Sequence, residues 1–222
     1  MTREAPEGFR QHRFTATDTA TTILLVRHGE SAAAIPGKPF ALRDGHGDPE
    51  LHPAGQLQAK RVGNRLAQER IDAIYVTSLV RTVQTAEPLA SLLGMQPHIE
   101  ADLREVFLGD WEGGILRERA SAGDPIFPKI YSEQRWDVIP GAEPQERFHE
   151  RTQHGLLRIV AAHPGGRVAV FTHGGVIGQL LHHATGAQAF AFTGADNASI
   201  SELVVDGERQ ILRRFNDTSH LD

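Results

Sequence analysis

The sequence contains no cysteine among its 222 residues. This absence excludes disulfides, a thiol nucleophile, and any zinc or iron–sulfur site held by cysteine ligands. The His-Glu-x-x-His pattern, which places two histidine ligands on one face of a helix, is absent as well. We therefore expect a reaction that uses neither a bound metal nor a cofactor.

Long apolar runs and long basic blocks are also lacking. No apolar stretch approaches the roughly 18 residues that a membrane-spanning helix requires. Residues 1–21 are polar and lack the apolar core of a secretory signal, so we expect a cytoplasmic protein that does not bind membranes. The formal net charge of −5 argues against nucleic acid as a partner.

The length and the hydrophobic content fit one large domain. With 222 residues, of which 40% are hydrophobic, the chain can bury a sizeable core. Residues 1–21 show no apolar period and are predicted to be an N-terminal extension. Residues 22–222 are predicted to be the domain itself.

Two apolar runs, far apart in the chain, both end in His-Gly. Residues 23–26 lead into Arg-His-Gly, and residues 168–172 lead into His-Gly-Gly. A continuous apolar run of this length is typical of a strand buried on both faces of a parallel sheet. Because ligands bind at the carboxyl ends of such strands, we expect Arg27, His28 and His173 to form a site there.

The rest of the chain alternates predicted helices and strands. Helices are predicted at about residues 53–69, 79–93, 143–163 and 176–183, and strands at 71–76, 96–100 and in a hairpin within 197–215. Residues 32–53, rich in proline and glycine, are predicted to form a long loop beside the site. This order predicts an α/β three-layer sandwich with a mostly parallel central sheet and helices on both faces.

Two charged residues outside the His-Gly strands are candidates for the same site. Thr77 and Ser78 are predicted to cap the helix at 79–93, which places Arg81 in its first turn. A cation there needs an anion close by, and a phosphate suits both a guanidinium and helix N-terminal amides. Glu105 stands among apolar neighbours, which favours an acid–base role. The alternatives are a solvated arginine and a surface glutamate.

Residues 24–31 resemble the signature of the histidine phosphatase superfamily, which includes the cofactor-dependent phosphoglycerate mutases. Further matches follow in the family's order at residues 78–86, 103–105, 109–113 and 172–175. The resemblance extends over roughly residues 22–220. It implies that residues 115–143 form a small cap insertion over the active site, where Arg135 and Trp136 are candidate contacts for the leaving group.

The resemblance also implies a reaction through a covalent phosphohistidine. His28 is then the nucleophile, and Glu105 protonates the leaving oxygen and afterwards helps to activate water. The other catalytic residues implied are Arg27, Arg81 and His173, which hold the phosphoryl group. The predicted substrate-binding residues are Arg27, Arg81, His173, Gly29, Gly174, Ser31 and Asn197, and no residue is predicted to bind a metal.

Ala34 departs from the family pattern, because many members have an asparagine there that can donate to phosphate. Asn197, or the backbone amides of Gly29 and Gly174, are candidates to replace it. The segment 141–144 reads Gly-Ala-Glu-Pro where Gly-Gly-Glu-Ser is frequent, so it keeps Glu143 and loses a hydroxyl.

We predict a metal-independent phosphatase of a small phosphorylated metabolite, because residues 81–86 and 216–221 resemble the broad-specificity phosphatase branch. Two alternatives stay open: a cofactor-dependent phosphoglycerate mutase, and a regulatory protein that binds phosphate esters and catalyses weakly. Assembly into a homo-oligomer is also left open by the sequence.

Overall fold

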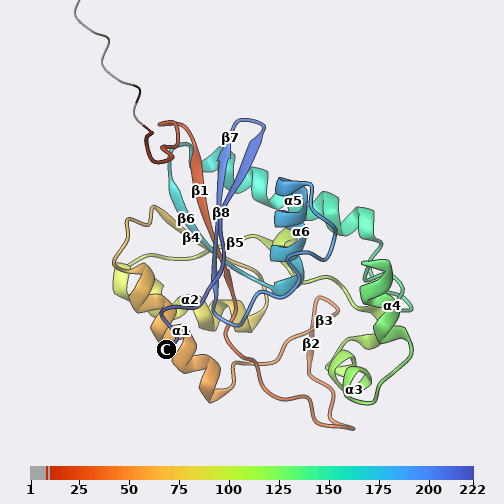
Figure 1. Ribbon diagram of the computed structural model, residues 1–222. Helices are drawn as coiled ribbons and strands as arrows, with labels where there is room; N and C mark the ends of the chain where they lie inside the picture. The colour runs from red at the N-terminus through yellow and green to blue at the C-terminus, as the bar shows by residue number, and fades with distance from the viewer. Residues whose placement is uncertain (1–8, 10) are drawn as a thin grey trace, which may run out of the picture.

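The computed structural model describes residue 9 and residues 11–222, so residues 1–8 and 10 of the predicted N-terminal extension lie outside the described residues. At its centre is a six-stranded sheet of order β5-β4-β6-β1-β7-β8 (Figure 1). The strands are β1 (Thr21–Arg27), β4 (Ala73–Val76), β5 (His98–Ile99), β6 (Arg167–Thr172), β7 (Ile200–Asp206) and β8 (Arg209–Asp217). Neighbours from β5 to β1 pair in parallel, whereas β7 is antiparallel to both β1 and β8. The sheet is mostly parallel, as predicted.

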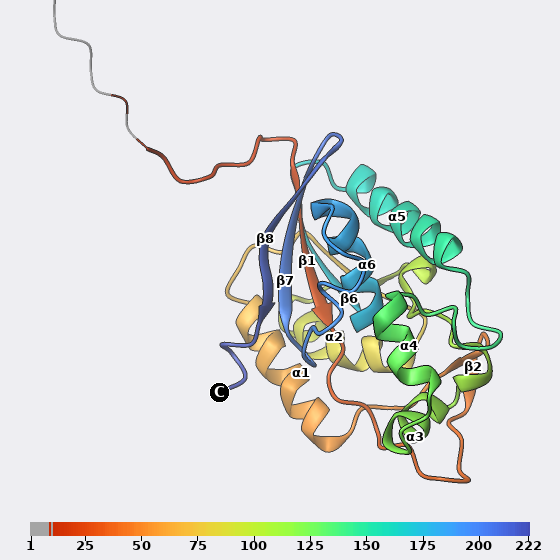
Figure 2. The same cartoon turned by 45° about the vertical axis from the view of Figure 1, so that its right-hand side comes forward.

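Helices cover both faces of this sheet (Figure 2). They are α1 (Pro53–Leu66) and α2 (Val80–Leu93) on one face, and α5 (Gln145–Ala162) and α6 (Gly174–Thr185) on the other. Successive side chains of a strand point to opposite faces, so Ile23 and Leu25 pack toward α5 and α6, and Leu24 packs toward α1 and α2. This explains why the run of residues 23–26 is apolar throughout and confirms the three-layer sandwich.

A separate small cluster lies in the predicted cap insertion. Its helices are α3 (Ile115–Ser121) and α4 (Ile126–Glu133), preceded by a 3₁₀ turn, η2 (Gly109–Trp111). Trp111, Ile130 and Ile139 form its buried centre. Figures 1 and 2 both place α3 and α4 beside the end of the sheet at which β1 finishes.

The segment 32–53, predicted to be a loop, contains a small antiparallel pair of strands, β2 (Leu42–Arg43) and β3 (His46–Gly47). The residues between them, Asp44 and Gly45, have positive φ angles of 51° and 85°. An Asp-Gly pair is favourable in such a turn. Strands of two residues are too short for an apolar alternation to reveal them.

The predicted capping of α2 by Thr77 and Ser78 is wrong. The cap residue is Leu79, whose side chain makes no capping hydrogen bond. The Val80 N–H instead donates to Oδ1 of Asp48, at 2.7 Å, so the segment 32–53 supplies the cap. Thr77 turns its hydroxyl toward Thr82 and His173.

The remaining elements agree with the sequence patterns. The predicted strand at 96–100 is β5, which spans His98–Ile99. It follows Gly94, which ends α2 in the left-handed conformation with φ of 63°. The C-terminal hairpin is β7 and β8, joined at Gly207, and it completes one side of the sheet.

Every helix in the described part of the chain is too short or too polar to cross a membrane.

Candidate active site

The carboxyl ends of β1 and β6 bring the two predicted histidines together. These strands pair in parallel with Arg27 opposite Thr172, so His28 and His173 are the next residues on each strand. Their ring centroids lie 5.2 Å apart with the planes at 63°. Their exposed fractions are 6% for His28 and 0% for His173, so both imidazoles are buried in one site.

The ring of His28 is held by its own turn. Nδ1 lies 2.7 Å from the carbonyl oxygen of Gly29. A carbonyl oxygen can only accept, so Nδ1 carries the proton and the lone pair of the neutral ring is on Nε2. Burial, followed by the charges of Arg81 and Arg27, holds the pKa of His28 well below its usual value. The imidazole is therefore neutral near pH 7, with its lone pair on Nε2.

The ring of His173 is held by a side chain. Its Nε2 lies 3.1 Å from Oγ1 of Thr77, and Nδ1 is buried without a hydrogen-bond partner among the described residues. Burial and then Arg81 hold the pKa of His173 well below its usual value. When the Thr77 hydroxyl donates to Nε2, Nδ1 carries the proton and can donate it to an oxygen anion.

Two guanidinium groups lie beside the histidines. Arg27 donates from Nη1 to the carbonyl oxygen of Ala195 at 2.6 Å, while its buried Nε has no partner among the described residues. Arg81 donates to the carbonyl oxygen of Gly47 at 2.9 Å and lies 3.9 Å from Oδ1 of Asp48. Burial lowers the pKa of both guanidinium groups. Asp48 thus supplies part of the negative charge expected near Arg81.

Glu105 faces the same space. It lines a cavity of about 180 Å³ together with Arg27, His28 and Arg81. Its Oε2 accepts from the Gly175 N–H at 3.2 Å, at the start of α6. The predicted acid, the two cations and the nucleophile candidate therefore surround one small cavity.

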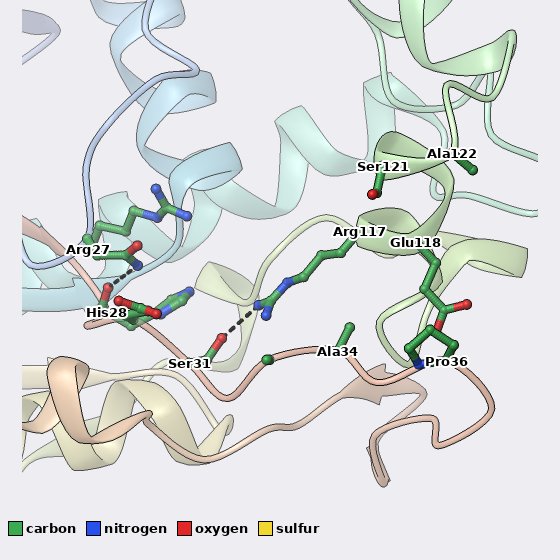
Figure 3. A pocket seen from close by; sticks show the side chains of 12 residues that line it. Arg27, His28, Ser31, Ala34, Pro36, Arg117, Glu118, Ser121 and Ala122 are labelled. Carbon is green, nitrogen blue, oxygen red and sulfur yellow. Dashed lines mark hydrogen bonds between the residues drawn. The ribbon is translucent and has the colours of Figure 1, made fainter.

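A larger cavity, of about 740 Å³, extends from Arg27 and His28 toward α3 (Figure 3). Arg117 of α3 reaches across it and donates to Oγ of Ser31 at 2.7 Å and to the carbonyl oxygen of Ala32 at 2.8 Å. The other residues that line this cavity are Glu30, Ser31, Ala33, Ala34, Pro36, Glu118, Ser121, Ala122 and Asn197.

The model of the histidine phosphatase superfamily (branch 1) matches residues 23–218 of the chain. The protein belongs to the histidine phosphatase superfamily, branch 1. It is 36% identical over 218 residues to phosphoglycerate mutase-like protein 4 of Arabidopsis thaliana, covering 96% of this chain and 92% of that protein. It is 31% identical to the metal-independent phosphoserine phosphatase of the same plant, covering 90% and 83%.

The fold of this histidine phosphatase is also that of solved relatives. The phosphoserine phosphatase of Entamoeba histolytica, solved with 3-phosphoglyceric acid, superposes with a TM-score of 0.73 at 25% identity, covering 91% of this chain and 100% of that one. Family membership and the phosphatase relatives identify the protein as a phosphatase. The family prediction made from residues 24–31 and the later motifs is confirmed.

Two of the phosphatase's predicted binding residues, Ser31 and Asn197, line the larger cavity. The Ser31 hydroxyl accepts from Arg117, and Asn197 donates from Nδ2 to the carbonyl oxygen of His28 at 2.9 Å. Asn197 therefore fixes the backbone of the His28 turn from the side of β7.

The two glycines predicted to donate backbone amides differ. Gly174 is the first residue of α6, and a Cβ atom there would lie 3.4 Å from Nε of Arg27. The Gly29 N–H donates to Oγ1 of Thr85 at 3.0 Å, so the prediction that this amide binds phosphate is not supported. Gly29 instead allows close packing, because a Cβ atom would lie 2.6 Å from the carbonyl oxygen of Gly55.

The two cap candidates also differ. Trp136 lines a small cavity with Arg27 and Glu105, whereas the exposed Arg135 pairs with Asp137 at 2.5 Å, away from the cavities. Arg117, which the sequence presented only as one of several cap cations, is the one that enters the site. Arg117 lies outside the segments that match the family motifs, so the sequence alone did not indicate that its long side chain reaches the site.

Arg151 of α5 is a second residue that the sequence did not single out. It donates to the carbonyl oxygens of Asp102, Arg104 and Glu105 at 2.7, 2.7 and 2.9 Å. It also forms a two-point pair with the buried Glu143, at 2.7 and 2.8 Å. Arg151 thus fixes the turn that carries Glu105.

The described residues contain no group of three or more His, Asp or Glu side chains arranged to hold a metal ion.

Proposed function

We propose that the protein hydrolyses phosphomonoesters without a metal ion, through a covalent phosphohistidine on His28. The observation that carries this proposal is the hydrogen bond from Nδ1 of His28 to the carbonyl oxygen of Gly29. It leaves the lone pair on Nε2, in a buried ring whose lowered pKa keeps it neutral. A neutral imidazole is a competent nucleophile at phosphorus.

In the first step, Nε2 of His28 forms a bond to phosphorus while the bond from phosphorus to the leaving oxygen breaks. Protonated Glu105 donates its proton to that oxygen, and the alcohol leaves. Arg27, Arg81 and the Nδ1 proton of His173 stabilise the charge on the remaining phosphoryl oxygens. This division of roles is supported by the shared cavity of Arg27, His28, Arg81 and Glu105.

In the second step, water attacks the phosphorus of phosphohistidine. The Glu105 carboxylate accepts a proton from the water, the bond between phosphorus and Nε2 breaks, and inorganic phosphate leaves. His28 returns to its neutral form. No other reactant is required, because the water supplies the oxygen that the phosphoryl group gains.

The substrate class that we propose is a small phosphorylated metabolite. This is supported by the relatives named for phosphoserine and by the structure holding 3-phosphoglyceric acid. The larger cavity, of about 740 Å³, continues from His28 and has room for such a leaving group. Residues 115–143 supply one of its walls, through Arg117, Glu118, Ser121 and Ala122, and we propose this segment as the specificity cap.

The test is hydrolysis of a panel of phosphomonoesters, including phosphoserine, glycerol phosphate and 3-phosphoglycerate, in excess chelator. We expect phosphate release at an unchanged rate. Loss of activity that one divalent ion restores would contradict metal independence. Interconversion of 2- and 3-phosphoglycerate faster than phosphate release would identify a mutase. Binding without turnover of any ester would identify a regulatory protein.

A further inference from the structure

Arg117 lies where the two cavities of the site meet. Three residues line both the cavity of about 180 Å³ and the cavity of about 740 Å³: Arg27, His28 and Arg117. Arg27 and His28 belong to the end of β1, whereas Arg117 comes from the cap helix α3. A cation from the cap therefore stands at the point where a phosphoryl group at His28 would join its leaving group.

The contacts of Arg117 fix it to the turn that carries the nucleophile. Its two terminal nitrogens donate to Oγ of Ser31 and to the carbonyl oxygen of Ala32. The ring of Phe40 lies on the guanidinium, 5.6 Å from its central carbon. Figure 3 shows the side chain extended from α3 toward Ser31 and His28. Its orientation is set by packing and by hydrogen bonds to the site.

The charge of Arg117 is not balanced by the groups that it contacts, because both of its hydrogen-bond acceptors are neutral oxygens. Burial and then the charge of Arg27 lower the pKa of Arg117, while Glu30 raises it. Arg27 and Arg117 are two guanidinium groups that line both cavities. An anion bound between them would accept from both, as a phosphate does.

Position 34 gives an independent reason for a donor on the cap. Ala34 stands where the resemblance described above places an asparagine, and Gly114, at the start of α3, lies close to it. A Cβ atom on Gly114 would lie only 3.1 Å from Cβ of Ala34, so a larger residue at position 34 would compete with the cap for space. Approach of α3 to Ala34 is also what brings Arg117, on the next turn, to Ser31.

We propose that Arg117 is a phosphate-binding residue contributed by the cap, taking the place of a side-chain donor at position 34. The ligand is the phosphoryl group of a phosphomonoester, or orthophosphate as the product. Arg117 then binds a phosphoryl oxygen on the side of the leaving group, opposite the Arg81 guanidinium and the His173 imidazole. This inference rests on the proposed function for its substrate, but its anion affinity can be measured without turnover.

The experiment is calorimetric titration of orthophosphate into the wild-type protein and the Arg117→Gln variant at one salt concentration. We expect the Kd for phosphate to rise about 10- to 100-fold, as for loss of a hydrogen bond to a charged group. Arg117→Lys should recover part of the affinity, because it restores the charge without the planar fork. The matched control is Arg119→Gln, on the same helix, which removes an exposed arginine paired with Asp124 at 3.1 Å and should leave the Kd unchanged.

Unchanged phosphate affinity in a folded Arg117→Gln protein would overturn the proposal. Thermal unfolding of each variant checks the fold, and failure of Arg117→Lys to recover any affinity would point to a purely structural contact with Ser31. If phosphate affinity falls as expected but no ester is hydrolysed by the wild type, only the proposed function fails. If esters are hydrolysed and affinity is unchanged, only the role of Arg117 fails. No phosphate binding by the wild type would contradict both.

Discussion

The ends of β1 and β6 place two histidines in matching positions with different partners. Both follow a buried parallel strand, and both have a pKa held well below the usual value by burial and by Arg81. His28 bonds through Nδ1 to a backbone carbonyl, whereas His173 bonds through Nε2 to the hydroxyl of Thr77. The two rings therefore use different nitrogens for these hydrogen bonds, and only the partner of His28 can do nothing but accept.

The different hydrogen-bond partners give the two imidazole rings different tautomer preferences. A carbonyl oxygen accepts only, so it fixes the tautomer of His28 and leaves the lone pair of the ring on Nε2. A hydroxyl both donates and accepts, so Thr77 allows His173 to carry its proton on Nδ1 and to donate it to a phosphoryl oxygen. In the proposed function, His28 is the nucleophile and His173 is a hydrogen-bond donor, although both follow equivalent strand ends and both are buried.

Replacing each histidine in turn tests this comparison most strongly. In His28→Ala no phosphoenzyme should form, because the nucleophile is gone. In His173→Ala it should still form, about 10²–10³-fold more slowly, since one donor to the phosphoryl oxygens is lost. Acid-quenched labelling with a phosphoester followed by peptide mapping is the measurement. Label recovered on His173 would show that the two roles are exchanged.

A Glu105 variant tests the proton transfer to the leaving oxygen, a role that the proposed function gives to neither histidine. Glu105→Gln should slow alkyl-ester hydrolysis by about 10²–10⁴-fold and p-nitrophenyl phosphate hydrolysis much less, because a phenolate leaves without a proton. The comparison of kcat/KM for the two esters is the measurement.

The matched control is Glu112→Gln, because Glu112 lines the same cavity but accepts from the Gly47 and Leu108 amides at 2.7 and 2.9 Å. Equal losses on both esters in Glu105→Gln would give Glu105 a binding or structural role. A selective loss on alkyl esters in Glu112→Gln would instead make Glu112 the acid.

The smallest expected effect comes from the partner of His173. Thr77→Val removes the hydroxyl at Nε2 and should lower kcat/KM by about 10-fold or less, the range for one neutral hydrogen bond. It should not change the site of labelling. Thr82→Val is the control, because Thr82 contacts Thr77 at 3.0 Å and not the imidazole. An equal loss in both variants would mean that the Thr77 hydroxyl acts through packing, and that His173 is oriented by burial alone.

The sheet could be predicted because its central strands are continuous apolar runs that are visible in the local sequence. The apolar run at 23–26 and its counterpart at 168–172 require burial on both faces, and each helix beside them repeats apolar residues at helical spacing. The cap of α2 was not predictable, because Asp48 reaches Val80 from a different segment and no local spacing encodes that contact. The strands β2 and β3 are too short to carry a pattern.

The site divides in the same way. Arg27, His28, Arg81 and His173 stand at the ends of elements, where topology alone brings them together. Arg117 and Arg151 reach the site through long side chains from helices whose placement depends on tertiary packing. The misassigned amide of Gly29 has the same cause, since its partner Thr85 lies on α2.

The position of β1 in the middle of the sheet also determines when, during synthesis, the sheet can form. Its neighbours are β6, at residues 167–172, and β7, at residues 200–206, so the strand made first pairs with two strands made late in synthesis. Until the ribosome has passed Asp206, the apolar side chains of residues 23–26 have no complete sheet to enter. Such long-range pairing slows folding. It also leaves aggregation-prone hydrophobic surface exposed on the nascent chain. The surroundings of His28 are therefore complete only after β7 has been synthesised.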